Sequence, residues 1–178
     1  MKINLMIRFV LLFCVVALAR PSHGHPQSAW KTFKSTDENF IVSMPAEPEQ
    51  EWTKGNSPLG NGHHIYNLDQ QNLSYTVSYS ELDAAPKDQK DIKRIFDISR
   101  DMVLAVRQGG LKGDKEIALD GFPGREVRIE VGKELVILRI YVVKNRIYQL
   151  MTSQPKTKSE NPDILKFYDS FRLIRKPE

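Results

Sequence analysis

The sequence of 178 residues has a single cysteine, Cys14, which lies inside an apolar run near the start of the chain. If that run is removed, no cysteine remains. A chain without cysteine has no disulfide, no thiol nucleophile and no thiolate ligand for a metal. Its stability must then come from a hydrophobic core, which a chain of this length can bury.

Long hydrophobic runs are also scarce, and the longest covers only the 11 residues from Phe9 to Ala19. A helix that crosses a bilayer needs about 20 apolar residues, so this run is too short to be an anchor. Lys2 and Arg8 precede it and small or polar residues follow, which is typical of a secretory signal peptide. The small residues fit cleavage before Arg20 and, nearly as well, before His25.

Cys14 does not fit a lipid anchor, because a lipoprotein signal has a small residue before its cysteine and Phe13 stands there. We therefore expect an exported protein, periplasmic or secreted, with no transmembrane anchor after cleavage. The expected organisation is a signal peptide over residues 1–19, or up to 24, then a flexible leader over 20–29 and one domain over 30–175.

The chain has no strong excess of either charge. Its formal net charge is +4, and the loss of Lys2 and Arg8 with the signal peptide lowers this to +2. A nucleic-acid partner would call for a concentrated basic surface, so we expect none. The expected partner is a protein or another component of the cell envelope.

Histidine is rare, with four in the chain, and no cofactor or metal site is predicted. His63 and His64 are adjacent in a predicted strand, so their side chains point to opposite faces and cannot share one metal. His25 offers an alternative, because cleavage before it would expose an amine and an imidazole that could bind copper.

Alternating apolar and polar residues predict short strands over much of the chain. Residues 88–107 instead have apolar side chains at helical spacing, interrupted by Ser99, and Gly109 and Gly110 are expected to end this long helix. A short helix is predicted over 163–171. Residues 134–143 are apolar on both faces, which indicates a central strand covered on each side. The fold class is therefore α+β: a central, largely antiparallel sheet in an α/β/α sandwich.

Two segments are interpreted as connections. The polar residues 46–62, rich in Gly, Pro and Asn, predict a long loop. The stretch "GFPG" predicts a type II turn, with Pro123 at its second position and Gly124 at its third with a positive φ.

No residue is predicted to be catalytic, because the chain lacks a G-x-S-x-G elbow and a phosphate-binding loop. Three residues are candidate ligand-binding residues: Arg125, Arg139 and His64. Arg125 is either one half of an exposed ion pair with Glu126 or an anion contact. Arg139 interrupts an apolar strand, so it either lies near the surface or lines a cleft.

The order of these features resembles that of small exported bacterial proteins similar in fold to PsbP and to the DcrB-type envelope proteins. The resemblance rests on "NFIVSMPAEPE", "GFPGRE", "RIYVVKNRIYQL" and "FYDSFRLI", and it covers most of residues 30–174. It implies a central antiparallel sheet with helices on both faces, and an accessory or binding role. None of these motifs is catalytic, and no PsbP-type ion ligands are matched.

Two functions are expected from these observations. The first is a non-enzymatic domain that binds an envelope component through an exposed aromatic patch, for which the candidates are Trp52, Tyr66, Tyr75 and Tyr79. The alternative is a small-molecule or anion site, with hydrolysis left open, in a cleft between sheet and helix. That alternative predicts that Arg125, Arg139 and His64 converge on one cavity.

Overall fold

The computed structural model describes residues 30–37, 39–57, 59–157 and 161–174. Its main feature is a seven-stranded antiparallel sheet in the order β3-β4-β5-β9-β8-β7-β6. These strands are β3 (Glu49–Ser57), β4 (Gly60–Gln70), β5 (Leu73–Glu81), β6 (Gly110–Leu119), β7 (Phe122–Val131), β8 (Glu134–Val143) and β9 (Arg146–Pro155). A second sheet in the order β1-β2-β10 contains β1 (Lys31–Lys34), β2 (Phe40–Met44) and β10 (Arg172–Leu173).

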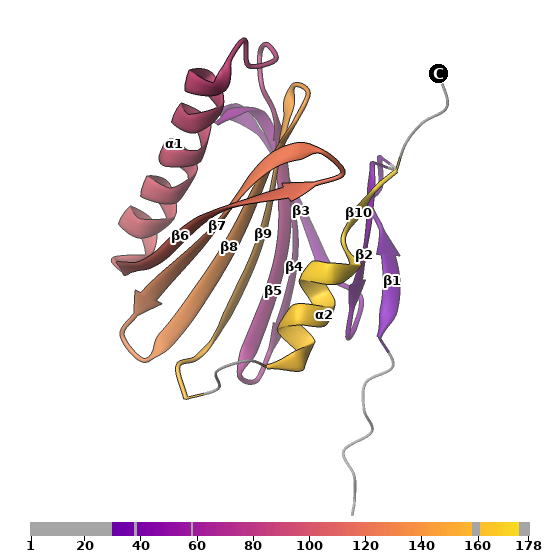
Figure 1. Cartoon of the computed structure of the whole chain (residues 1–178). Helices are drawn as coiled ribbons and strands as arrows, with labels where there is room; N and C mark the ends of the chain where they lie inside the picture. The colour runs from indigo at the N-terminus through magenta and orange to yellow at the C-terminus, as the bar shows by residue number, and fades with distance from the viewer. Residues whose placement is uncertain (1–29, 38, 58, 158–160, 175–178) are drawn as a thin grey trace, which may run out of the picture.

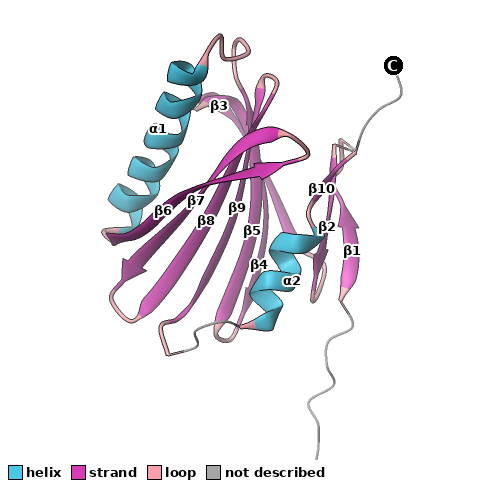
Figure 2. Ribbon diagram, viewed as in Figure 1, coloured by secondary structure: helices cyan, strands magenta, loops and turns pink. Residues whose placement is uncertain are grey.

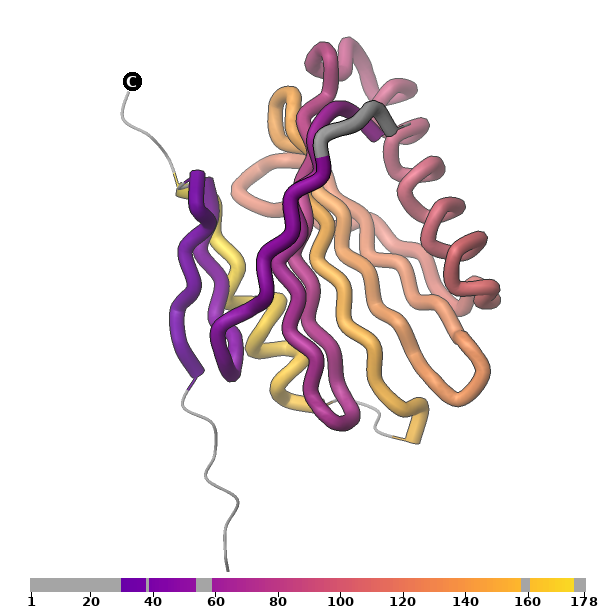
Figure 3. The backbone as a smooth tube through the Cα atoms, turned by 180° about the vertical axis from the view of Figure 1, so that it is seen from behind, coloured from indigo at the N-terminus to yellow at the C-terminus, as the bar shows by residue number. Residues whose placement is uncertain are grey.

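Two helices complete the structure, α1 (Gln89–Arg107) and α2 (Pro162–Ser170). Helix α1 lies on one face of the large sheet, and α2 lies on the other face together with the small sheet (Figures 1 and 2). The strands twist along the sheet, as the view from behind also shows (Figure 3). The predicted α+β sandwich with one long and one short helix is confirmed.

Strand β8 is buried on both faces, as its sequence predicts. Val136, Leu138 and Ile140 pack into the cluster under α1, whereas Ile137 and Tyr141 pack into the cluster under α2 and the small sheet. Each face of the large sheet therefore has its own hydrophobic core, and β8 contributes to both. This arrangement holds the two outer layers in fixed positions relative to one sheet.

Helix α1 begins and ends where the sequence predicts. Asp88 is its N-cap, and one side-chain oxygen accepts 2.9 Å hydrogen bonds from the backbone N–H groups of Lys90 and Asp91. Its last residue is Arg107, and the C-cap residue Gln108 adopts the left-handed conformation with φ of 51°. The prediction that glycine caps the helix was therefore wrong. The C-cap is Gln108, whose backbone N–H closes the last turn.

The spacing of the apolar residues suggests that their whole stripe on α1 is buried, but only part of it is. Phe96 and Ser99 are buried, but Met102 is 38% exposed and Val106 is 79% exposed. The helix packs mainly on β7 and β8. Its C-terminal half consequently leaves apolar side chains above the neighbouring strands, where a cleft lies.

The prediction of a long loop over residues 46–62 was wrong, because this segment forms β3 and the start of β4. Polar residues hid the strand signal. An edge strand needs backbone pairing on one side only, so β3 can be polar and still form a strand beside β4. Strand β3 ends at Ser57, which pairs with Gly60 at the start of β4.

The predicted turn at Pro123 and Gly124 was also misplaced. The reversal occurs at Asp120 and Gly121, which have φ values of 52° and 85° and join the paired residues Leu119 and Phe122. Two central residues with positive φ and the sequence Asp-Gly fit a two-residue hairpin. Pro123 and Gly124 instead lie within β7.

Gly124 has a different role, which is to make room for an aromatic ring. It pairs with Tyr141 on β8, and a Cβ added at Gly124 would lie 2.5 Å from Cδ1 of Tyr141 and 2.9 Å from the backbone oxygen of Ile140. Backbone atoms cannot move aside cheaply in a central sheet. The glycine is therefore required by close packing and not by its φ.

We predict that Gly124→Ala lowers the free energy of unfolding by about 1–3 kcal/mol through overpacking against Tyr141. The measurement is urea denaturation followed by circular dichroism. Gly110→Ala is the matched control, because an added Cβ there meets nothing within 4 Å. Equal stability of Gly124→Ala and the wild type would contradict this account.

Candidate functional site

A cleft of about 550 Å³ lies between the C-terminal half of α1 and the sheet. Met102, Val103 and Val106 form its helical wall, and Met151 on β9 forms part of its floor. Leu59, just before β4, also contacts it. Volumes of this order are typical of small-molecule sites, and the apolar walls suit a hydrocarbon group.

Ser99 contributes a buried hydroxyl to this cleft. Its side chain is fully buried, and its Oγ has no hydrogen-bond partner in the part of the chain that the structure describes. A buried polar group without a partner costs about 1–3 kcal/mol. Ser99 therefore leaves one hydrogen-bonding group unsatisfied beside the apolar wall of the cleft.

His63, Gln149 and Arg107 add polar groups at the borders of the cleft. The Nδ1 of His63 lies 2.8 Å from Oγ of Ser80, which fixes the orientation of the ring. Burial and the neighbouring His64 both lower the pKa of His63, so the imidazole is neutral at pH 7. The cleft thus has few charges and a small number of placed hydrogen-bonding groups.

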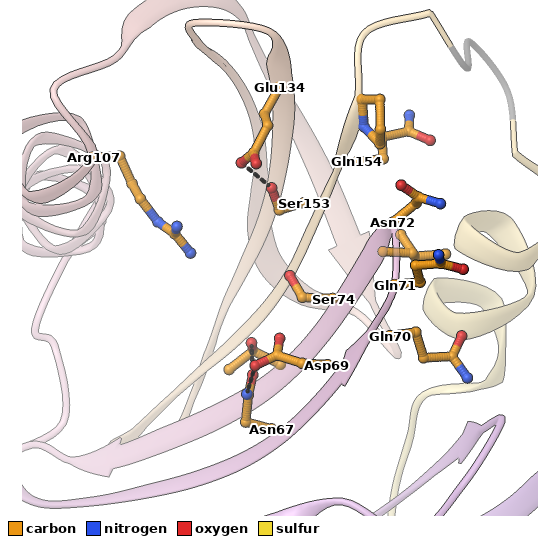
Figure 4. A pocket seen from close by; sticks show the side chains of 13 residues that line it. Asn67, Asp69, Gln70, Gln71, Asn72, Ser74, Arg107, Glu134, Ser153 and Gln154 are labelled. Atoms are coloured by element: carbon orange, nitrogen blue, oxygen red, sulfur yellow. Dashed lines mark hydrogen bonds between the residues drawn. The ribbon is translucent and has the colours of Figure 1, made fainter.

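A second cavity, of about 420 Å³, is polar (Figure 4) and shares Arg107 with the cleft. Arg107 lines both spaces and reaches from α1 toward Ser74, Ser153 and Glu134 on the sheet. The Oγ of Ser153 donates a 2.8 Å hydrogen bond to Glu134. The two cavities are therefore neighbours and share one basic side chain.

The structure does not bring the three predicted site residues together. Arg125 lies on the α1 face, where its guanidinium is 2.8 Å from Oδ1 of Asp97 and 3.3 Å from Oδ1 of Asp114. The guanidinium also sits over the ring of Phe96. The exposed pair with Glu126 was therefore wrong, because the two residues point to opposite faces of β7. Arg125 anchors α1 to the sheet.

Arg139 lies on the opposite face of the sheet, in a buried ion pair. Its Nε is 2.9 Å from Oε2 of Glu126, which is 2% exposed, and its guanidinium is 4.4 Å from the ring centroid of Tyr168 on α2. Lys115 is a further partner of Glu126, at 3.1 Å. Arg139 lies in the middle of β8, and its charge is neutralised in place by Glu126.

His64 belongs to a third environment, beside the small sheet. Its ring stacks on Tyr79 with centroids 4.4 Å apart, and Arg146 lies over the same tyrosine at 4.7 Å. Arg146 also donates a hydrogen bond of 3.2 Å to Asp37 in the turn after β1. This cluster ties the small sheet to the large one. Ligand binding by His64, Arg125 or Arg139 stays a prediction, but no single cavity contains all three.

The expected aromatic patch is largely absent from the surface. Tyr66, Tyr75 and Tyr79 are buried between the two sheets, and only Trp52 of the four is exposed, at 58%. The tyrosine face that the sequence suggested as a docking surface is in fact covered by β1, β2 and α2. This removes the observation on which a protein-docking role would rest.

The comparison with solved structures identifies the architecture. The solution structure of cyanobacterial PsbP (CyanoP) from Synechocystis sp. PCC 6803 matches with a TM-score of 0.58 and 15% sequence identity, over 85% of this chain and 96% of that chain. The fold is PsbP-like. A Pseudomonas aeruginosa protein of unknown function, PA94, matches with a TM-score of 0.38 and 10% identity, over 72% of this chain and 84% of that chain. No known protein family matches the sequence, and no curated protein does.

An identity of 15% supports the PsbP-like fold and no shared activity, so function must be argued from the site itself. Among the described residues, no helix is long and apolar enough to cross a membrane, and no three His, Cys, Asp or Glu side chains gather as metal ligands. The predicted signal peptide, Cys14 and His25 all lie outside the described residues. Export and the copper alternative remain predictions.

The residues that line the cleft of this PsbP-like chain were not predicted from the sequence to form a site. Ser99 was the available signal, because it is the polar interruption in the apolar stripe of α1. His63 was considered only as a metal ligand. The cleft could not be derived from spacing, because it depends on where α1 lies across the sheet.

We predict that Ser99→Ala raises the free energy of unfolding by about 1–2 kcal/mol, because it removes a buried hydroxyl without a partner. Thermal and urea denaturation measure the change. Ser80→Ala is the matched control and should destabilise, because the Ser80 hydroxyl is buried and bonded to His63. A loss of stability in Ser99→Ala would show that the hydroxyl has a partner.

Glu126→Gln removes the buried carboxylate and leaves Arg139 without its close partner, so we expect a loss of about 3–5 kcal/mol of stability at neutral pH. Burial alone would raise the pKa of Glu126, but hydrogen bonds from Arg139 and Lys115 outweigh it and hold that pKa below its ordinary 4.5. The charged carboxylate therefore stabilises the fold above about pH 4.5, and its contribution is lost as the pH falls below that value.

Urea denaturation of both proteins across this acid range is the measurement. The stability of the wild type should approach that of Glu126→Gln as the pH falls. A difference that stays constant from neutral to acid pH would contradict the assignment.

Proposed function

We propose that this protein is a non-enzymatic binding domain that holds the apolar part of a small molecule in the cleft between α1 and the sheet. The observation that carries the proposal is the cleft itself, with apolar walls from α1 and β9 around the unpartnered Ser99 hydroxyl. Hydrocarbon surface moved from water into such a space gains about 25 cal/mol per Å².

The exposure of the helix supports this role. Met102 and Val106 remain open to solvent at the mouth of the cleft, although a helix stripe normally buries such residues. A bound molecule that covers them would complete the core that α1 leaves unfinished. The cleft thus has apolar surface that a bound molecule can bury.

The polar groups of the cleft favour binding over catalysis. His63 is held by Ser80, and no described group supplies the hydrogen-bonded base that would make Ser99 a nucleophile. Together with the signal-peptide pattern of residues 1–19, this supports an exported accessory protein that binds a small molecule. A small-molecule site was the alternative expectation from sequence, but the residues expected to form it were different.

Binding of the neutral fluorescent probe N-phenyl-1-naphthylamine tests the proposal. We predict saturable binding to the wild type and at least tenfold weaker binding to Val106→Glu, which places a charge at the mouth of the cleft. Leu165→Glu is the control, because Leu165 is a similarly exposed apolar residue, 51% exposed, on α2 across the sheet. No saturable binding, or equal losses in both variants, would contradict the proposal.

A further inference from the structure

We propose that the polar cavity beside the cleft binds an uncharged polyhydroxyl head group, so that the ligand is a single-chain amphiphile of the glycoside type. This inference rests on the proposed function, since the cleft must hold the hydrocarbon chain. It adds the chemical class of the head group and the residues that recognise it.

The two cavities form one continuous binding surface along the strands. On β9, Gln149 and Met151 line the cleft and Ser153 lines the polar cavity, and these alternate residues point to the same face. Successive residues on one face of a strand are about 7 Å apart, so chain and head group are separated by roughly one such step. Arg107 stands at the junction and contacts both cavities.

The polar cavity is rich in groups that both donate and accept hydrogen bonds. Asn67, Ser74, Thr76 and Ser153 all line it from the open face of the sheet. Three bonds already order part of this set: Thr76 to Asn67 at 2.8 Å, Asn67 to Asp69 at 3.0 Å and Ser153 to Glu134 at 2.8 Å. Sugar hydroxyls also donate and accept, so such a surface matches them group for group.

The charges of the cavity disfavour an ionic head group. Asp69 and Glu134 supply two negative charges, and the C-terminal end of α1 adds partial negative charge, against the single positive charge of Arg107. An anion would meet a net negative surface. A cation would meet the guanidinium of Arg107 at the point where head group and chain join. Hydroxyl groups satisfy the carboxylates and the guanidinium at once.

Arg107 is also free to take part. The partly buried Arg100, Arg125, Arg139 and Arg146 each lie within ion-pair distance of a carboxylate. Arg107 has no such partner among the residues that the structure describes, and it reaches into the polar cavity (Figure 4). Its donors can therefore bind a ligand oxygen without breaking an existing ion pair.

Three probes with the same decyl chain test the head-group class: decyl glucoside, decanoate and decyltrimethylammonium. Each is titrated below its critical micelle concentration, both directly by calorimetry and by displacement of N-phenyl-1-naphthylamine. We expect decyl glucoside to bind about tenfold or more tightly than either ionic probe, as two or three hydrogen bonds would give.

The double variant Ser74→Ala/Thr76→Val removes two hydroxyls from the polar cavity and none from the cleft. Decyl glucoside should bind it about tenfold more weakly, with naphthylamine binding unchanged. Thr32→Val/Ser43→Ala is the matched control, because these paired residues lie in the small sheet. It should bind both probes as the wild type does.

The outcomes separate the two proposals. If naphthylamine does not bind, the proposed function itself fails. If it binds and is lost in Val106→Glu, but decanoate or decyltrimethylammonium binds as tightly as decyl glucoside, only the head-group inference is overturned. Unchanged glucoside affinity in Ser74→Ala/Thr76→Val would likewise overturn it and leave the apolar site in place.

Discussion

The burial of β8 on both faces is the constraint on which the rest of the structure depends. A strand with Val136, Leu138 and Ile140 on one side and Ile137 and Tyr141 on the other cannot border water on either face. The chain must therefore supply a cover for each side. Helix α1 covers one, and α2 with the small sheet covers the other, so the sandwich follows from the composition of a single strand.

The two covers differ in how completely they close, and that difference creates the site. On one face, β1, β2 and α2 bury a continuous aromatic layer that includes Phe40 and Phe167. On the other, α1 is anchored over β7 and β8 by Phe96 and by the Arg125–Asp97 pair. One helix cannot cover seven strands, so the α1 face of β4, β5 and β9 stays open and becomes the floor of the cleft and of the polar cavity.

Local pattern was enough to predict the elements whose burial is regular. The period of two in Tyr75, Val77 and Tyr79 reflects one continuous buried face. The helical spacing of 88–107 reflects a face that is buried at Phe96, and both elements were predicted correctly. Strand β3 was missed because an edge strand is stabilised by backbone pairing with β4 and needs no apolar face. The site was missed for a related reason. His63 on β4 is distant in sequence from Ser99 and Arg107 on α1, and only the placement of α1 brings the three to one cleft.

The pairing of β5 with β9 has a consequence for how the site comes into being. In the large sheet as described, all neighbouring strands except β5 and β9 are consecutive in the chain. Strands β5 and β9 are separated by α1 and three strands. The floor of the cleft crosses this β5–β9 junction, with His63 on the β4–β5 side and Met151 on the β9 side. Neither the segment before β6 nor the segment after it contains all of the residues that line the cleft. The cleft exists only once β5 and β9 have paired, and a molecule bound in it would contact both parts of the sheet and stabilise that pairing.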